Sequence, residues 1–133
     1  MRKYLLLFLS LGIILGLFWS FPIKVGPKSK LVESAKQQVT VVLDFGQGAK
    51  REAKVSAGTA FEALKIAAKE SNLEVKTKQY DFGIFVESTG GVENTKERAW
   101  IYFVNGKTGE VASDKYLLKK GDLVEWKYIK PIY

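Results

Sequence analysis

The sequence predicts an α+β fold, in which one helix packs on a mixed β-sheet, preceded by an N-terminal transmembrane helix. Residues 4–23 carry no charge, residues 60–71 repeat apolar side chains at helical spacing, and short alternating apolar runs fill most of the chain from residue 39. A length of 133 residues suits one domain. We therefore expect three segments: a membrane anchor or signal segment at 1–23, a tether at 24–38 and one folded domain at 39–133.

The segment Tyr4–Ile23 runs for twenty residues without a charge and follows the basic pair Arg2 and Lys3. A helix of that length spans about 30 Å, which is the thickness of a bilayer's hydrocarbon core. Trp19 suits the interfacial aromatic belt, and Pro22 stands where the helix can end. Cleavage after the small residues Ser20 or Gly26 would place Phe18 or Lys24 at the −3 position, where a signal peptide needs a small residue. A retained signal anchor is therefore predicted, with a cleaved signal peptide as the alternative.

Most of the net charge of +7 lies in residues 1–38, which hold six basic residues against one acidic residue. The remaining 95 residues hold 15 basic and 13 acidic side chains, so they lack the basic surface that nucleic-acid binding needs. A short basic tail before a first apolar segment favours an N-terminus in the cytoplasm. We therefore expect a single-pass protein of the cell membrane whose C-terminal domain is extracytoplasmic and binds no nucleic acid.

The folded domain begins with a predicted hairpin, which is followed by the one helix predicted within it. Val39–Phe45 and Lys50–Val55 alternate apolar and polar residues around a glycine-rich turn. Thr59 then begins a helix over Ala60–Ser71. Glu62 completes a capping box with Thr59, in which its carboxylate is expected to reach back to the amide of Thr59.

Four further strands are predicted after the helix, each with alternating apolar residues. They are Leu73–Tyr80, Gly83–Ser88, Trp100–Asn105 and Leu123–Ile129. Asn105-Gly106 is a signal for a two-residue hairpin turn, and Lys120-Gly121-Asp122 marks another turn. The order strand, strand, helix and then strands is that of a β-grasp arrangement, in which the helix covers one face of a single mixed sheet.

The chain contains no cysteine and no histidine, which excludes disulfides, thiolate-ligated metal centres, cysteine nucleophiles and Ser-His-Asp triads. It therefore also lacks the cysteines of ferredoxin-like β-grasp proteins, and it ends in KPIY rather than in the diglycine of ubiquitin-like modifiers. Glu87 and Glu93 form a candidate carboxylate pair, but a shared loop is a poor place for the burial that acid–base catalysis needs. Asp81-Phe82-Gly83 matches a kinase tripeptide without the loops that accompany it in kinases. We therefore expect a non-catalytic protein with no resident cofactor and no metal site.

Several segments of the folded domain occur in a characteristic order. They are Gly58-Thr59 opening an Ala-Phe-Glu-Ala-Leu helix, Gly83-Ile-Phe-Val86 followed by Gly90-Gly91-Val92, Trp100-Ile-Tyr-Phe-Val-Asn-Gly106, and Leu118-Lys-Lys-Gly-Asp122 leading into Val124-Glu-Trp-Lys-Tyr128. Taken together they resemble the transcobalamin-like C-terminal domain family. This is a β-grasp family of largely unknown function, found in exported and surface-attached microbial proteins, and the resemblance covers about residues 39–133.

In the cobalamin carriers for which that family is named, this domain closes over the corrinoid as a lid on a larger helical domain, for which this sequence shows no counterpart. The resemblance therefore implies a membrane-anchored binding module, with cobalamin as a candidate ligand rather than a resident cofactor. The alternative is a non-catalytic protein-interaction or structural module of a cell-surface assembly. The positions that match the family's lid are the loop Glu87–Ala99 and the hairpin entered by Trp100.

The predicted ligand-binding residues are Ser88, Thr89, Gly90, Gly91, Trp100 and Tyr102. The glycine pair permits positive φ angles and close approach of a ligand to the backbone. For the aromatic residues, strand alternation leaves two alternatives open. Either Ile101 and Phe103 face the core and Trp100 and Tyr102 form an open aromatic platform, or Trp100 and Tyr102 are buried beneath the segment Tyr80–Phe85.

Overall fold

The computed structural model describes residues 35–131. The unit Val32–Tyr133 contains every described helix and strand together with a hydrophobic core. The predicted anchor Tyr4–Ile23 and most of the predicted tether lie outside the described residues. Between residues 35 and 131, no helix is both long enough and apolar enough to cross a membrane.

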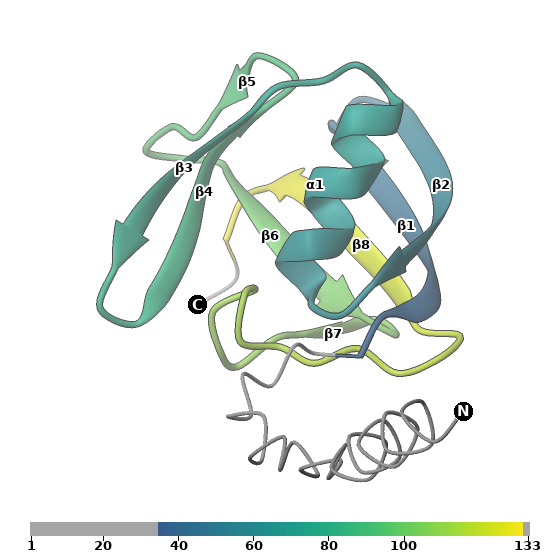
Figure 1. Cartoon of the computed structure of the whole chain (residues 1–133). Coiled ribbons are helices and arrows are strands. Elements are labelled where there is room, and N and C mark those ends of the chain that lie inside the picture. Colours follow the sequence, from purple (N-terminus) through teal and green to yellow (C-terminus); the bar gives the residue numbers. More distant parts are fainter. Residues whose placement is uncertain (1–34, 132–133) are drawn as a thin grey trace, which may run out of the picture. The chain divides into compact units, whose positions relative to one another are not determined.

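The first sheet has five strands in the order β2-β1-β8-β6-β7 (Figure 1). Its strands are β1 (Gln37–Asp44), β2 (Lys50–Ala57), β6 (Ala99–Val104), β7 (Lys107–Thr108) and β8 (Leu123–Ile129). β1 pairs antiparallel with β2 and parallel with β8, while β6 pairs antiparallel with both β8 and β7. The helix α1 (Ala60–Glu70) packs on one face of this sheet (Figure 1).

A second sheet, in the order β3-β4-β5, corrects the expectation of a single mixed sheet. It consists of β3 (Val75–Tyr80), β4 (Gly83–Thr89) and β5 (Val92–Glu93). β3 is exposed on both faces from Lys76 to Tyr80, so its lysine, threonine and glutamine side chains suit an outer strand and not the interior of a larger sheet. The hairpin of β3 and β4 stands away from the first sheet at its turn (Figure 1). The α+β class is confirmed, with one helix and two sheets in the described part of the chain.

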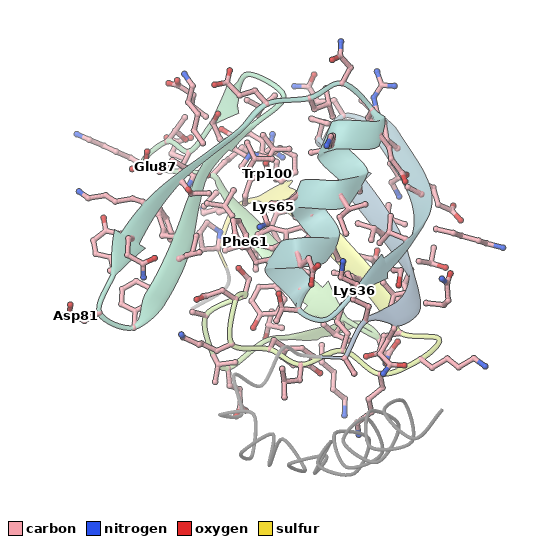
Figure 2. All side chains as sticks on the ribbon, viewed as in Figure 1. Lys36, Phe61, Lys65, Asp81, Glu87 and Trp100 are labelled. Atoms are coloured by element: carbon pink, nitrogen blue, oxygen red, sulfur yellow. The ribbon has the colours of Figure 1, made fainter. Side chains whose placement is uncertain are left out.

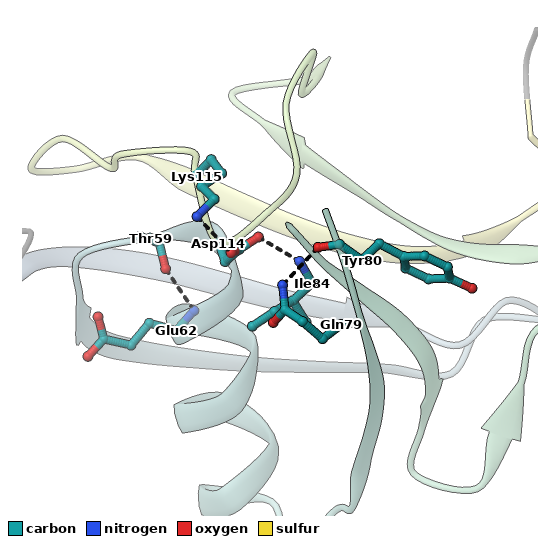
Figure 3. Close-up of polar contacts among 7 residues, drawn as sticks. All are labelled: Thr59, Glu62, Gln79, Tyr80, Ile84, Asp114 and Lys115. Carbon is teal, nitrogen blue, oxygen red and sulfur yellow. Dashed lines mark hydrogen bonds and ion pairs between the residues drawn. The ribbon is translucent and has the colours of Figure 1, made fainter. Parts of the chain in front are cut away.

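The start of α1 follows the predicted capping box with one shift. The hydroxyl of Thr59 accepts a hydrogen bond from the amide of Glu62 at 3.1 Å (Figure 3). The carboxylate of Glu62 accepts from the amide of Gly58 at 2.9 Å, and not from that of Thr59 as expected. The physical reason is that Thr59 forms an antiparallel bridge with Leu117, which holds its backbone beside another segment. The helix ends at Glu70, one residue before the predicted end.

The predicted two-residue turn connects β6 and β7. Asn105 and Gly106 have φ angles of 51° and 81°, which a type I′ turn requires of both central residues. Val104 and Lys107 pair across this turn. The turn signal in the sequence is therefore confirmed, although β7 itself was not predicted because it contains only two residues.

One hydrophobic core fills the face of the first sheet on which α1 lies. Alternate residues of three strands point into it: Val39, Val41, Leu43, Trp100, Tyr102, Val104, Val124, Trp126 and Tyr128. From α1 the core receives Phe61, Leu64 and Ala67, and from β4 it receives Val86. The second sheet therefore shares the core with the helix.

The orientation of β6 decides between the two alternatives for its aromatic residues. Trp100 and Tyr102 are only 3% and 8% exposed, while Ile101 and Phe103 are half-buried on the opposite face. The open aromatic platform is therefore wrong, and the burial of Trp100 and Tyr102 is confirmed. The reason lies in the length of α1, because eleven residues span only about 16 Å and leave room on the sheet for large rings beneath β4.

Candidate binding cleft between the two sheets

The first four predicted site residues lie at the end of β4 and in the turn that follows. Ser88 and Thr89 belong to β4 and are 2% and 0% exposed. Gly90 and Gly91 form the turn into β5, with φ angles of 58° and 80°. The expected irregular loop Glu87–Ala99 is therefore partly strand, because it contains the end of β4 and all of β5.

The packing around these four residues explains why the sequence has glycines there. A Cβ on Gly90 would lie 3.1 Å from Leu73 and 3.2 Å from Phe45, so this position touches the core. A Cβ on Gly91 would meet no atom within 4 Å. The hydroxyl of Thr89 is buried without a hydrogen-bond partner among the described residues, and it lies out of reach of a ligand at the surface. A role of these residues in ligand binding stays a prediction.

Trp100 holds β5 against the first sheet. Its Nε1 donates to the carbonyl of Val92 at 2.8 Å, and the hydroxyl of Tyr128 donates to the carbonyl of Glu93 at 2.8 Å. The indole also packs edge-on against Phe45, with ring centres 5.3 Å apart. Figure 2 shows Trp100 between the β3–β4 hairpin and α1. Its position therefore couples the two sheets.

The two sheets separate between β4 and β6, and this gap forms a hollow lined largely by aromatic residues. β6 pairs with β8 along its whole length, but its other edge pairs with β7 only at Phe103 and Val104. β4 likewise pairs with β5 only at Ser88 and Thr89. The hollow between these edges, which we call the inter-sheet cleft, has a volume of about 190 Å³. Its lining residues are Phe82, Ile84, Phe85, Val86, Trp100, Ile101, Tyr102, Gly109, Ala112, Ser113 and Trp126.

The inter-sheet cleft has an exposed aromatic mouth and a buried aromatic floor. Phe82 and Phe85 on the hairpin are 62% and 38% exposed. Trp100, Tyr102 and Trp126 are buried, so only their edges reach the cleft. Larger hollows exist elsewhere, including one of about 510 Å³ beside the β6–β7 turn, but its lining mixes charged and polar residues with apolar ones and contains a single aromatic ring, Tyr116. Stacking on aromatic rings is therefore the interaction that the inter-sheet cleft offers best.

Tyr102 supplies a neutral hydroxyl near the floor of the cleft. This hydroxyl donates to the carbonyl of Val111, and the ring packs against Trp126 and Tyr116 with ring centres 5.5 and 5.9 Å apart. Burial, followed by the neighbouring Tyr116, raises the pKa of Tyr102 to about 12. The phenol therefore stays protonated at physiological pH and acts as a hydrogen-bond donor. Gly109 lies against this ring, and a Cβ at that position would overlap with it.

Asp114 fixes the hairpin at the base of the cleft. Its carboxylate accepts a hydrogen bond from the amide of Ile84 at 2.9 Å, as Figure 3 shows, and lies 3.6 Å from the ammonium of Lys115. Gly83 has a φ angle of 136°, and a Cβ there would lie 2.5 Å from both Ala112 and Asp114. Close backbone approach of this kind requires glycine. The wall of the cleft is therefore held in place by the segment after β7.

The cleft does not contain the candidate carboxylate pair. Glu87 and Glu93 line a separate hollow together with Lys76, Ser88 and Asn94, and Figure 2 shows Glu87 on the outer side of the hairpin. Among residues 35–131, no three or more acidic, histidine or cysteine residues come together as a metal site. The groups that line the inter-sheet cleft thus suit non-covalent binding by stacking and hydrogen bonds.

Of the residues that line this cleft, only Trp100 and Tyr102 were predicted from the sequence as site residues. The other lining residues were not predicted. Phe82, Ile84 and Phe85 come from the hairpin, and Ala112 and Ser113 come from an irregular segment for which no structure was predicted. A signal was present in the sequence, because three aromatic residues cluster within Tyr80–Phe85 around a turn. Such a cluster beside a glycine is unusual for a solvent-exposed turn.

The fold defines an α+β domain in which one helix and two sheets share a single core. Residues 58–130 match the model of the family described as Domain of unknown function (DUF4430), and this match covers more than half of the chain. The protein therefore belongs to the DUF4430 family. A search of curated proteins found no match.

Solved structures that are similar to this fold include the following two. One is a candidate metal-binding protein from Ruminococcus gnavus ATCC 29149, with 18% sequence identity and a TM-score of 0.60, covering 72% of this chain and 99% of that protein. The other is haptocorrin in complex with Cbi, with 12% identity and a TM-score of 0.63, covering 74% of this chain. The chain spans about a quarter of haptocorrin, since the match covers 26% of that chain. At these identities the similarity shows the fold.

Proposed function

We propose that this protein is a membrane-anchored, extracytoplasmic and non-catalytic binding module of β-grasp fold, which holds a planar small molecule such as a corrinoid at the inter-sheet cleft. The observation that carries the proposal is the gap between β4 and β6, with exposed phenylalanines at its mouth and tryptophan edges at its floor. The structural similarity to haptocorrin in complex with Cbi supports a corrinoid as the first ligand to test. The uncharged segment Tyr4–Ile23 supports the anchor and the location.

The size of the cleft supports partial enclosure of the ligand. Sites that bury a drug-sized ligand have volumes of about 300–1,000 Å³, whereas this cleft has about 190 Å³. A planar ligand would therefore insert one edge between Ile84 and Ile101 and lay part of its face against Phe85. Most of the ligand would stay outside the cleft, which is the arrangement expected when a domain covers a ligand from one side.

The lining also supports binding over catalysis. Every cleft side chain is apolar, aromatic or a hydroxyl, and Tyr102 keeps its proton at physiological pH. With no histidine in the chain, no side chain of ordinary pKa titrates between pH 5 and 8. Binding at this site should therefore depend weakly on salt and on pH in that range.

The experiment is a fluorescence titration of residues 32–133 with cobinamide and cobalamin. In this unit the only tryptophans are Trp100 and Trp126, and both line the cleft, so a bound corrinoid should quench their emission. Ile101→Ala and Phe85→Ala should each weaken binding about tenfold, because each removes about 1–2 kcal/mol of apolar contact. Phe103→Ala is the matched control, because this ring lies on the same strand face as Ile101 but outside the cleft.

Three outcomes would count against the proposal. If neither corrinoid changes the tryptophan emission at micromolar concentration, corrinoids are excluded as ligands. If Phe103→Ala and Ile101→Ala lose corrinoid affinity equally, the cleft is excluded as the binding site. Loss of binding in Gly91→Ala alone would instead place the ligand at the turn between β4 and β5, which contains Gly90 and Gly91 of the predicted site.

A protein-interaction module is the second candidate function, and exposed apolar side chains outside the cleft favour it. Val111 and Leu117 are 50% and 60% exposed in the irregular segment after β7. Capture of another envelope protein by the full chain, with loss of capture in Leu117→Ser and no response to corrinoids, would favour this function.

A further inference from the structure

The turn of the β3–β4 hairpin carries an aromatic cluster that the hydrophobic core does not use. Tyr80, Phe82 and Phe85 are 39%, 62% and 38% exposed, and none of them belongs to the core. The rings of Tyr80 and Phe82 stack with centres 5.1 Å apart, and Phe85 packs edge-on against Tyr80. Three exposed aromatic rings gathered at one projecting turn indicate an interaction surface.

The charges beside these rings indicate the chemistry of the partner. Lys76 and Lys78 are exposed on β3, and the ammonium of Lys78 lies 5.2 Å from the centre of the Tyr80 ring. Glu87 lines a hollow together with Lys76 on the outer side of the hairpin. Asp81 lies at the turn itself, as Figure 2 shows. A carboxylate at this position disfavours insertion into hydrocarbon, but it is compatible with the headgroup layer, where aromatic residues are enriched and lysines meet anionic lipids.

We infer that the hairpin turn docks on the surface of an anionic lipid bilayer, with the three rings at the level of the headgroups and both lysines near lipid phosphates. This inference goes beyond small-molecule binding, and one part of its support rests on the proposed anchor. If residues 4–23 span a bilayer, the tether of about thirteen residues keeps the domain within about 45 Å of the lipid surface. Such a high effective concentration would strengthen a contact that the hairpin also makes by itself.

The side of the hairpin is also suited to a flat surface. On β3 and β4, Lys78 and Phe85 are cross-strand partners, and Tyr80 lies two residues from Lys78 on the same face. Gln79 and Ile84 pair on the other face, where Ile84 packs against the core. Lys78 and Tyr80 therefore lie on the side of the hairpin opposite Ile84, while Phe82 and Phe85 also line the mouth of the cleft, and a bilayer can contact the exposed parts of all three rings without opening the fold.

The test uses residues 32–133, which form a compact unit with a complete core, and a fluorescent label on a single introduced cysteine. The chain contains no native cysteine, so labelled Gln79→Cys reports on the hairpin alone. The vesicles contain equal parts of phosphatidylcholine and phosphatidylglycerol, with a fraction of brominated lipid as a quencher. We expect the label at position 79 to be quenched and the label in Lys119→Cys, on a distant turn, to stay unquenched.

Two variants identify the groups that bind. Tyr80→Ser combined with Phe82→Ser should lower vesicle binding at least tenfold. Replacing Lys76 and Lys78 with glutamine should lower it about fivefold per lysine, while the same replacement of Lys119 and Lys120 should not change it. Circular dichroism of each variant checks that the fold is intact.

The inference is overturned if vesicles quench neither label, if they quench both labels equally, or if the control lysines matter as much as those of β3. It is also overturned if neutral and anionic vesicles bind equally. A corrinoid titration of the Lys76 and Lys78 variants separates this result from the proposed ligand site, because these lysines do not line the cleft, whereas Phe82 and Phe85 do.

Discussion

The side-chain amide of Asn94 joins the two sheets through Trp100, because its Oδ1 accepts a hydrogen bond from the backbone amide of Trp100 at 2.9 Å. The Nδ2 of the same side chain donates to the carbonyl of Val86 at 2.9 Å. β4 and β6 do not pair with each other in a strand ladder. Asn94 therefore takes the place of direct strand pairing and sets the separation at which the inter-sheet cleft begins.

Removing this side chain should weaken the attachment of the second sheet. Asn94→Ala leaves the amide of Trp100 and the carbonyl of Val86 without these partners, so we expect the free energy of unfolding to fall by about 2–4 kcal/mol. Asn94→Asp keeps the acceptor but loses the donor, so it should cost less. Urea denaturation measures both variants, and equal midpoints for Asn94→Ala and the wild type would show that the amide does not couple the sheets.

Two glycines offer a matched comparison of backbone strain with steric overlap. Gly83 and Gly91 both have positive φ angles, but a Cβ on Gly83 would lie 2.5 Å from Ala112 and Asp114, whereas a Cβ on Gly91 meets open space. Gly91→Ala should therefore cost about 1 kcal/mol. Gly83→Ala should cost clearly more and should raise amide exchange at Ile84, measured by hydrogen exchange. Similar costs for the two variants would mean that the hairpin base is not held by this contact.

The helix and most strands were predictable because their signals are local. The capping residue Thr59, the Asn105-Gly106 turn and the alternation in Leu123–Ile129 each act within a few residues of the chain. The division into two sheets was not predictable in this way. It depends on Asn94 and Asp114, whose side chains bind the inner edge of β4 at Val86 and Ile84, 8 and 30 residues away along the chain.

Trp100 should behave as a core residue in solution. Trp100→Ala removes a ring that is 3% exposed and should lower the free energy of unfolding by about 3–5 kcal/mol. Trp100→Phe keeps most of the packing and loses the hydrogen bond to Val92, so about 1–2 kcal/mol is expected. Thermal melting measures both, and an unchanged melting temperature in Trp100→Ala would contradict the burial of this residue.

Alkaline pH should destabilise the fold through Tyr102. The folded state raises the pKa of this phenol from 10 to about 12, so it favours the neutral form. The contribution to stability is complete below about pH 10 and is lost as the pH rises through 12. Tyr102→Phe should reduce the fall in the free energy of unfolding between pH 9 and pH 12 by no more than about 2 kcal/mol. If the free energy of unfolding, measured by urea denaturation, falls equally with pH in the wild type and in Tyr102→Phe, the folded state does not raise the pKa of Tyr102.

The candidate site was less predictable than the fold, for a physical reason. Alternation along β6 separates Trp100 and Tyr102 from Ile101 and Phe103, but it does not say which pair faces the core. That choice depends on α1 covering only part of the sheet and on β4 covering the rest. Phe85 and Ala112 meet in one cleft only because Gly83 lets two distant segments approach each other.

The most direct test of the central claim is a map of backbone amide chemical shifts in ¹⁵N-labelled residues 32–133 during titration with cobinamide. Binding at the inter-sheet cleft predicts the largest shifts at Ile84, Phe85, Ile101 and Ala112, with small shifts at Gly91 and at Lys119. No shifts at saturating cobinamide, or shifts confined to the turn of Gly90 and Gly91, would contradict the assignment of the cleft as the ligand-binding site.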